Sequence, residues 1–90
     1  MQHTDEKTEY LRKVIGKVFN EVRCKSNLSC NKIENEYEIG RGIINRIENA
    51  KIDTKIITAW RLSEALGVKL SDIIKTVEDM VGNNFKITDL

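Results

Sequence analysis

The chain has one histidine, His3, and two cysteines, Cys24 and Cys30, which are the residue types most typical of zinc sites and thiol chemistry. The cysteines are separated by five residues, which is outside the CxxC-type spacing of zinc sites, and the chain offers no full set of ligands. His3 has no evident nucleophile partner, and no paired carboxylates suggest general acid–base chemistry. We therefore expect no metal, no cofactor and no enzymatic activity, and we interpret both cysteines as reduced thiols.

The composition is that of one globular domain rather than of a disordered or membrane protein. Of the 90 residues, 40% are hydrophobic and 32% are charged, and no apolar run approaches the roughly 20 residues of a membrane-spanning helix. The polar start MQHTDEKTEY carries no secretory signal, so we expect a cytoplasmic protein. The net charge of +1 argues weakly against a nucleic-acid partner unless basic residues are concentrated locally.

Apolar residues recur at helical spacing along most of the chain, which contains no proline. A long stripe predicts a helix over residues 5–25. Two short helices follow, the first with Ser29 as N-cap and with Ile33 and Tyr37 on one face, and the second after a break at Gly40. The tight connection between them is a helix-turn-helix pattern.

Two further helices are predicted after residue 53. Thr54 is expected to cap the first, and Gly67 closes it. Its inner face is predicted to carry Ile56, Ala59, Trp60 and Leu66. Ser71 is expected to cap the last helix, whose stripe of Ile73, Ile74, Val77, Met80 and Val81 ends at Gly82. The sequence thus predicts an all-α domain over residues 1–82 and a tail over 83–90, either a short strand or a docking segment.

The segment Leu28–Lys51, LSCNKIENEYEIGRGIINRIENAK, resembles the helix-turn-helix of the Cro and Xre-type phage-repressor family. The resemblance lies in Leu28, Ser29, Ile33, Tyr37, Ile39, Ile44, Arg46, Ile47, Glu48 and Lys51. The later segment WRLSEALGV, Trp60–Val68, is similar to the fourth helix of that family. The resemblance implies a five-helix, lambda-repressor-like DNA-binding domain and a transcriptional regulator of Cro/Xre type, most simply a repressor.

Several residues depart from the family pattern in the helix-turn-helix itself. Cys30 stands where glutamine is usual, Glu34 where alanine is usual, and Gly40 where a capping serine is usual. Glu38 replaces a glycine that is often left-handed, a conformation that costs other residues roughly 1–2 kcal/mol. Gly42 adds flexibility in the first turn of the second motif helix.

The resemblance implies a recognition helix over Arg41–Asn49 lying in the major groove of double-stranded DNA. Arginine can donate two hydrogen bonds to guanine, asparagine can pair with adenine, and isoleucine can touch a thymine methyl group. The implied base-contacting residues are Arg41, Gly42, Ile43, Asn45 and Arg46. The implied phosphate-contacting residues are Ser29, Cys30, Lys32, Asn49, Lys51 and Lys55. Arg23 and Glu48 are expected to form a structural ion pair between the first helix and the recognition helix.

Local charge supports this interpretation only in part. Residues 40–55 carry a net charge of +2 and residues 71–90 a net charge of −2. Glu34, Glu36 and Glu38 lie in the motif, however, and a carboxylate near phosphate would weaken binding. They leave open an alternative, a helix-turn-helix retained as a protein-interaction module such as an antitoxin or accessory subunit.

Two expectations concern the remaining surface. A domain of this size is marginal as a monomer, so we expect a homodimer. Its surface is predicted on the last helix and tail, at Val77, Met80, Val81 and Phe85; the alternative is that these residues close the core of the monomer. Cys30 is expected at a helix N-terminus, which could lower its pKa and make it a thiol switch.

Overall fold

The computed structural model describes residues 4–88, and within them the chain forms five helices and no strand. The helices are α1 (Thr4–Lys25), α2 (Cys30–Glu36), α3 (Ile43–Glu48), α4 (Ile56–Ala65) and α5 (Leu70–Val81). The predicted all-α, five-helix fold is therefore confirmed, and the helix predicted over 5–25 is correct to within one residue. None of these helices is long and apolar enough to cross a membrane.

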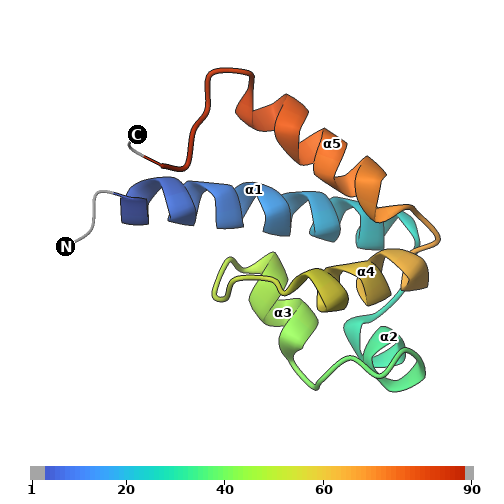
Figure 1. Ribbon diagram of the computed structural model, residues 1–90. Coiled ribbons are helices and arrows are strands. Elements are labelled where there is room, and N and C mark those ends of the chain that lie inside the picture. Colours follow the sequence, from blue (N-terminus) through green and yellow to red (C-terminus); the bar gives the residue numbers. More distant parts are fainter. Residues whose placement is uncertain (1–3, 89–90) are drawn as a thin grey trace.

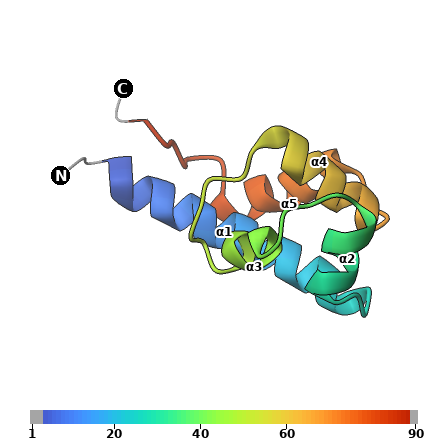
Figure 2. The same ribbon diagram turned by 90° about the horizontal axis from the view of Figure 1, so that it is seen from below.

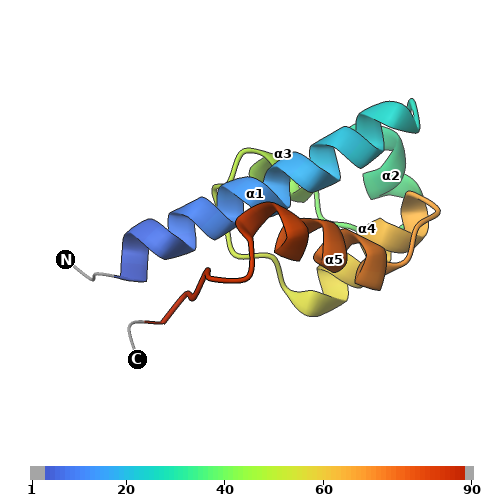
Figure 3. The ribbon, with the colours of Figure 1, turned by 90° about the horizontal axis from the view of Figure 1, so that it is seen from above.

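Helix α1 runs through the middle of the molecule, between α5 on one side and α3 and α4 on the other (Figure 1). It packs against both α3 and α5, whereas α2 packs on α3 and α4 packs on α5. Seen from above, α5 lies along α1, and the chain after it returns toward the start of α1 (Figure 3). The long first helix is thus the support on which the helix-turn-helix, α2 and α3, is mounted.

The core is built from the apolar stripes of these helices. Phe19, Ile33, Ile44, Ile47 and Leu62 are each at most 1% exposed. Burial of one such side chain is worth roughly 1.5–3 kcal/mol, so this cluster supplies the main driving force for folding. Two of these residues belong to α3, which explains how a helix of only six residues is held in place.

The helix ends agree only partly with the sequence. Ser29 caps α2 as predicted, and its Oγ accepts a hydrogen bond from the Lys32 N–H at 3.1 Å. The predicted caps Thr54 and Ser71 are wrong, because α4 and α5 follow Lys55 and Lys69, extended residues without a side-chain capping bond. Hydroxyl residues at these places in the sequence therefore indicated the helix starts only to within a residue or two.

The inner face predicted for α4 is half wrong. Ala59 and Leu66 are buried as expected, but Ile56 is 62% and Trp60 is 56% exposed. The buried face is completed by Leu62, Ser63 and Ala65. Apolar residues recur at helical spacing on both faces of α4, and the contact with α5 selects the face that is buried. In α2, Tyr37 likewise does not share the buried face of Ile33, since it ends the helix and is 40% exposed.

The surface predicted for dimerisation is also corrected. Val77 is 4% exposed and belongs to the core of the monomer, so it is not available to a second copy. Val81 and Phe85 are half-buried, and the Phe85 ring lies 5.7 Å from the Tyr10 ring. Only Met80 of the predicted set is well exposed. The tail up to residue 88 forms no strand and docks on α1 through this ring contact.

Candidate nucleic-acid interface

The N-terminal end of α3 is held by a carboxylate from α2. Gly42 is the N-cap, with a φ of 80° and no side chain to cap the helix. The carboxylate oxygen Oε2 of Glu34 accepts a hydrogen bond from the Gly42 N–H at 3.0 Å, and Glu34 is only 8% exposed. A negative charge is favoured at this end of a helix. Glu34 thus supplies, from the neighbouring helix, the acceptor that the capping position lacks.

The C-terminal end of α3 is held by a partly buried ion pair with α1. Arg23 donates from Nε to Glu48 Oε2 at 2.6 Å and from Nη2 to Glu48 Oε1 at 2.9 Å. Asn20 donates to the same carboxylate at 2.8 Å, and Arg23 also donates to the Leu28 carbonyl at 2.9 Å. The hydrogen bond to Glu48 raises the pKa of Arg23 above its ordinary value, so the guanidinium stays charged. The pair implied by the family resemblance is present, and it joins α1, α3 and the loop before α2.

Helix α3 is shorter than the recognition helix expected over Arg41–Asn49. Arg41 lies in the turn before it and Gly42 caps it, so regular helix begins only at Ile43. The positive φ of Gly42 is incompatible with a helix interior, which explains the later start. The Ile43 N–H donates to the Gly40 carbonyl at 3.1 Å and closes the turn.

The polar residues expected to contact bases share the outer surface of this short helix. Arg41, Asn45 and Arg46 are exposed, whereas Ile44 and Ile47 face the core. The guanidinium of Arg46 lies near Gly42: a Cβ atom added at Gly42 would be 3.6 Å from Arg46 Nη1, an ordinary van der Waals contact. The positive φ at position 42, rather than lack of space, is what favours glycine there. Ile43 is half-buried.

The residues expected to contact phosphates lie on both sides of α3. Seen from below, α3 is flanked by α2 and by the loop leading to α4 (Figure 2). Ser29, Cys30 and Lys32 begin α2, and the hydroxyl of Ser29 is engaged in capping. Lys51 and Lys55 are exposed in the opposite loop. Asn49, at the end of α3, is exposed and donates to the Asn45 side chain at 2.8 Å.

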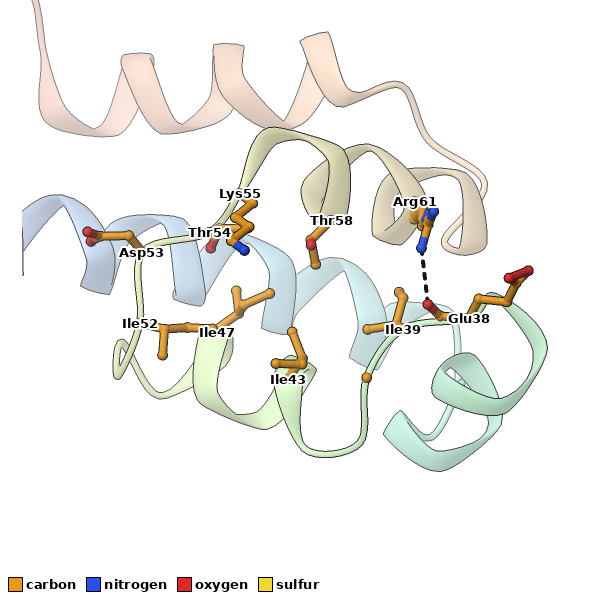
Figure 4. Close-up of a pocket in the computed structure, with 11 residues that line it drawn as sticks. Glu38, Ile39, Ile43, Ile47, Ile52, Asp53, Thr54, Lys55, Thr58 and Arg61 are labelled. Carbon is orange, nitrogen blue, oxygen red and sulfur yellow. Dashed lines mark hydrogen bonds between the residues drawn. The ribbon is translucent and has the colours of Figure 1, made fainter.

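A pocket of about 240 Å³ separates α3 from the start of α4 (Figure 4). Its floor is apolar, from Ile39, Ile43, Ile47 and Ile52, and its other wall carries Thr54, Lys55, Thr58 and Arg61. Arg61 donates to the Glu38 carbonyl at 3.2 Å and closes one end, while the Glu38 carboxylate points away (Figure 4). Asp53 at the other end pairs with Arg12 at 2.6 Å. The wall of the pocket that faces α3 therefore presents cationic and hydroxyl groups.

The three glutamates of the motif occupy different environments. Glu34 is buried and bonded to Gly42, so the expectation that its charge would face phosphate is wrong. Glu36 is exposed on α2. Glu38 is exposed and left-handed, with a φ of 57°, as expected for the position of a turn glycine. Only two of the three carboxylates therefore remain to oppose an anionic partner.

The thiol chemistry expected of Cys30 is also corrected. Burial raises the pKa of the Cys30 thiol above its ordinary value, and this effect exceeds the opposing attraction of Arg23. Although Cys30 begins α2, it is therefore less reactive than an ordinary thiol at neutral pH. Both cysteines are free, and residues 4–88 contain no group of His, Cys, Asp and Glu that could hold a metal ion. His3 lies outside the described residues.

One part of this surface was not predicted from the sequence. Lys13, Lys17 and Asn20 of α1 lie beside Asn45 and Asn49 of α3 and line a shared groove. Their spacing along α1 showed a polar face, but nothing in that spacing indicated which helix the face would adjoin. Gly16 could have indicated this neighbour, because a glycine inside a helix often marks the place where another backbone approaches closely.

The chain belongs to a family of helix-turn-helix proteins. A profile of the Cro/C1-type helix-turn-helix family matches residues 19–73, which run from the middle of α1 through α2, α3 and α4 to the start of α5. This family consists of DNA-binding regulatory domains rather than enzymes. No curated protein and no solved structure matches the chain. The family thus fixes the class of protein, a DNA-binding helix-turn-helix regulator with a lambda-repressor-like fold.

Proposed function

We propose that this protein is a sequence-specific transcriptional regulator, acting as a repressor in the cytoplasm, with α3 lying in the major groove of double-stranded DNA. The observation that carries the proposal is the anchoring of α3 at both ends, by Glu34 and by Arg23, with Arg41, Asn45 and Arg46 left exposed. A short helix fixed in this way can present its polar side chains to base edges with little loss of side-chain and backbone entropy.

The test is selection of bound sequences from a random duplex library, followed by titration of the best sequence at two salt concentrations. Binding should be sequence-selective and should weaken steeply with salt. Arg41→Ala and Arg46→Ala should each reduce the preference for the selected sequence by roughly 1–3 kcal/mol. Lys51→Ala should instead weaken binding to all sequences alike. Absence of binding by the unchanged protein at low salt would refute the proposal.

We further propose that the protein acts as a homodimer on half-sites about one helical turn apart. Because Val77 is buried, we assign the dimer contact to the exposed apolar residues Ile56, Trp60 and Ile74 of α4 and α5. The adjoining groove, of about 630 Å³, also contains Glu64 and Lys69, whose opposite charges can pair across a two-fold axis. Trp60 is the single tryptophan, so its emission should shift to shorter wavelength as protein concentration rises.

The second candidate function is a protein-interaction module. The same exposed Trp60 and Ile56 favour it, since contiguous apolar surface often marks a partner site. A protein that remains monomeric, shows no salt-dependent DNA binding and keeps an exposed tryptophan would support this candidate over the first.

A further inference from the structure

A polar groove of about 460 Å³ runs between α1 and α3 on the side of α3 away from α4. One wall is α1, with Lys13, Lys17 and Asn20 spaced along a single helical face. The other wall is the end of α3, with Asn45, Asn49 and Ala50. Every side chain of the walls except that of Ala50 is polar or charged, which is typical of a surface for a charged, hydrated partner rather than for an apolar one.

The electrostatics of the groove are positive. Its only carboxylate, Glu48, is neutralised by Arg23, which holds it with two hydrogen bonds. Lys13 and Lys17 are exposed, and neither forms an ion pair within residues 4–88. Two uncompensated positive charges therefore remain, side by side on one turn of α1, and they match an anionic partner.

Gly16 explains why these lysines lie so close to the proposed recognition helix. It stands between them in α1, and a Cβ atom there would be 2.5 Å from the Ile47 carbonyl oxygen and 2.8 Å from that of Glu48. The absence of a side chain at Gly16 lets α1 touch the backbone of the last turn of α3. The two ammonium groups are thereby fixed beside that turn, next to Asn45 and Asn49.

We propose that this groove, through Lys13, Lys17, Asn20 and Asn49, binds the sugar–phosphate backbone of DNA that flanks the recognition helix. The assignment rests on the proposed function, and it adds α1 to the contacts expected from the helix-turn-helix. Each lysine neutralises one phosphate, and the asparagine amides offer hydrogen-bond donors and acceptors to the same strand. These contacts carry no base information, so they strengthen binding to any sequence.

The test compares Lys13→Gln/Lys17→Gln with a matched control, Lys75→Gln/Lys86→Gln, which removes the same charge from exposed lysines of α5 and the tail. Binding to the selected duplex and to a random duplex is titrated between 50 and 200 mM salt, about the range over which phosphate contacts dominate the salt dependence. Thermal unfolding checks that both variants keep their fold, as substitution of exposed lysines allows.

Loss of two phosphate contacts should reduce the slope of log affinity against log salt by about 1.8, so that the fall in affinity over this salt range becomes roughly tenfold smaller. The groove variant should show this change equally on both duplexes, and the control should keep the slope of the unchanged protein. An unchanged slope in the groove variant, or an equal loss in the control, would overturn the groove assignment while leaving the proposed function standing. Failure of the unchanged protein to bind DNA would overturn both.

Discussion

The two ends of α3 are anchored by the same kind of group in different ways. At its start, the Glu34 carboxylate accepts a single hydrogen bond from the backbone N–H of Gly42. At its end, the Glu48 carboxylate accepts two hydrogen bonds from the Arg23 guanidinium and one from Asn20. The first anchor ties α3 only to α2, within the helix-turn-helix. The second ties α3 to α1, which also contacts α5.

The backbone differs at the two ends as well. Both ends of α3 adjoin a residue with positive φ, Gly42 at 80° and Ala50 at 58°. Glycine adopts this conformation freely, whereas alanine pays roughly 1 kcal/mol or more for it. The start of α3 thus has an unstrained backbone and one side-chain hydrogen bond, whereas its end has a strained backbone and three side-chain hydrogen bonds. The difference indicates that, of the two polar anchors, the Arg23–Glu48 pair holds α3 more firmly.

The largest effect should come from breaking that pair. Glu48→Ala leaves the Arg23 guanidinium, whose side chain is 18% exposed, without its main partner. Removal of one member of a fully buried pair costs roughly 3–5 kcal/mol, and because this pair is only partly buried, the free energy of unfolding should fall by about 2 kcal/mol in urea titration. Asp79→Ala is the matched control, because its pair with Lys75 spans 3.7 Å on the surface and should contribute less than about 0.5 kcal/mol.

The Cys30 thiol gives an independent readout of the same change. Glu48 is one of the groups that raise the pKa of Cys30, and Arg23 lowers it. Without Glu48 the pKa of Cys30 should fall, so more thiolate is present at pH 8 and alkylation becomes faster. A Glu48→Ala protein with unchanged stability and unchanged alkylation rate would show that the pair does not anchor α3.

A smaller effect should follow from removing the anchor at the start. Glu34→Ala deprives the Gly42 N–H of a charged acceptor, and a bond of this kind is worth roughly 1.5 kcal/mol. The loss should appear in urea unfolding and in weaker sequence preference, because the turn that carries Arg41 loosens. The control is Glu36→Ala on the exposed side of α2.

The smallest effect should be a gain. Ala50→Gly relieves the left-handed strain at the end of α3 and should raise the free energy of unfolding by roughly 0.5–1 kcal/mol, less the entropy that glycine adds to the unfolded chain. The matched control is Ala59→Gly inside α4, where the same substitution should be destabilising by about 1 kcal/mol or more. A loss of stability in Ala50→Gly would contradict the comparison of the two ends.

The sequence predicted those features that depend on local patterns. Helical spacing of apolar residues gave the helices, and Ser29, Gly67 and Gly82 marked helix ends correctly. Arg23 and Glu48 were matched only through the family resemblance, because nothing local joins residues 25 positions apart. The spacing of apolar residues did not predict which helices contact one another.

The errors share one physical cause. Which face of α4 is buried depends on its contact with α5, and both candidate faces of α4 carry apolar residues. The charge of Glu34 was expected near DNA because its partner, the backbone of Gly42, carries no signature in the sequence. The groove beside Lys13 and Lys17 exists only because Gly16 allows two helices to touch. Each is a property of packing between elements rather than of a single element.

The contact between Tyr10 and Phe85 has a consequence for the order in which the domain opens. This ring contact holds the tail against the early turns of α1, which are remote from α3 (Figure 1). These segments lie near the two ends of the chain, so their amide hydrogens should exchange with solvent early and together. The amides around Phe19, by contrast, should exchange only when the whole domain unfolds. Thermal breathing would then begin at the far end of the molecule and leave the anchored helix α3 undisturbed.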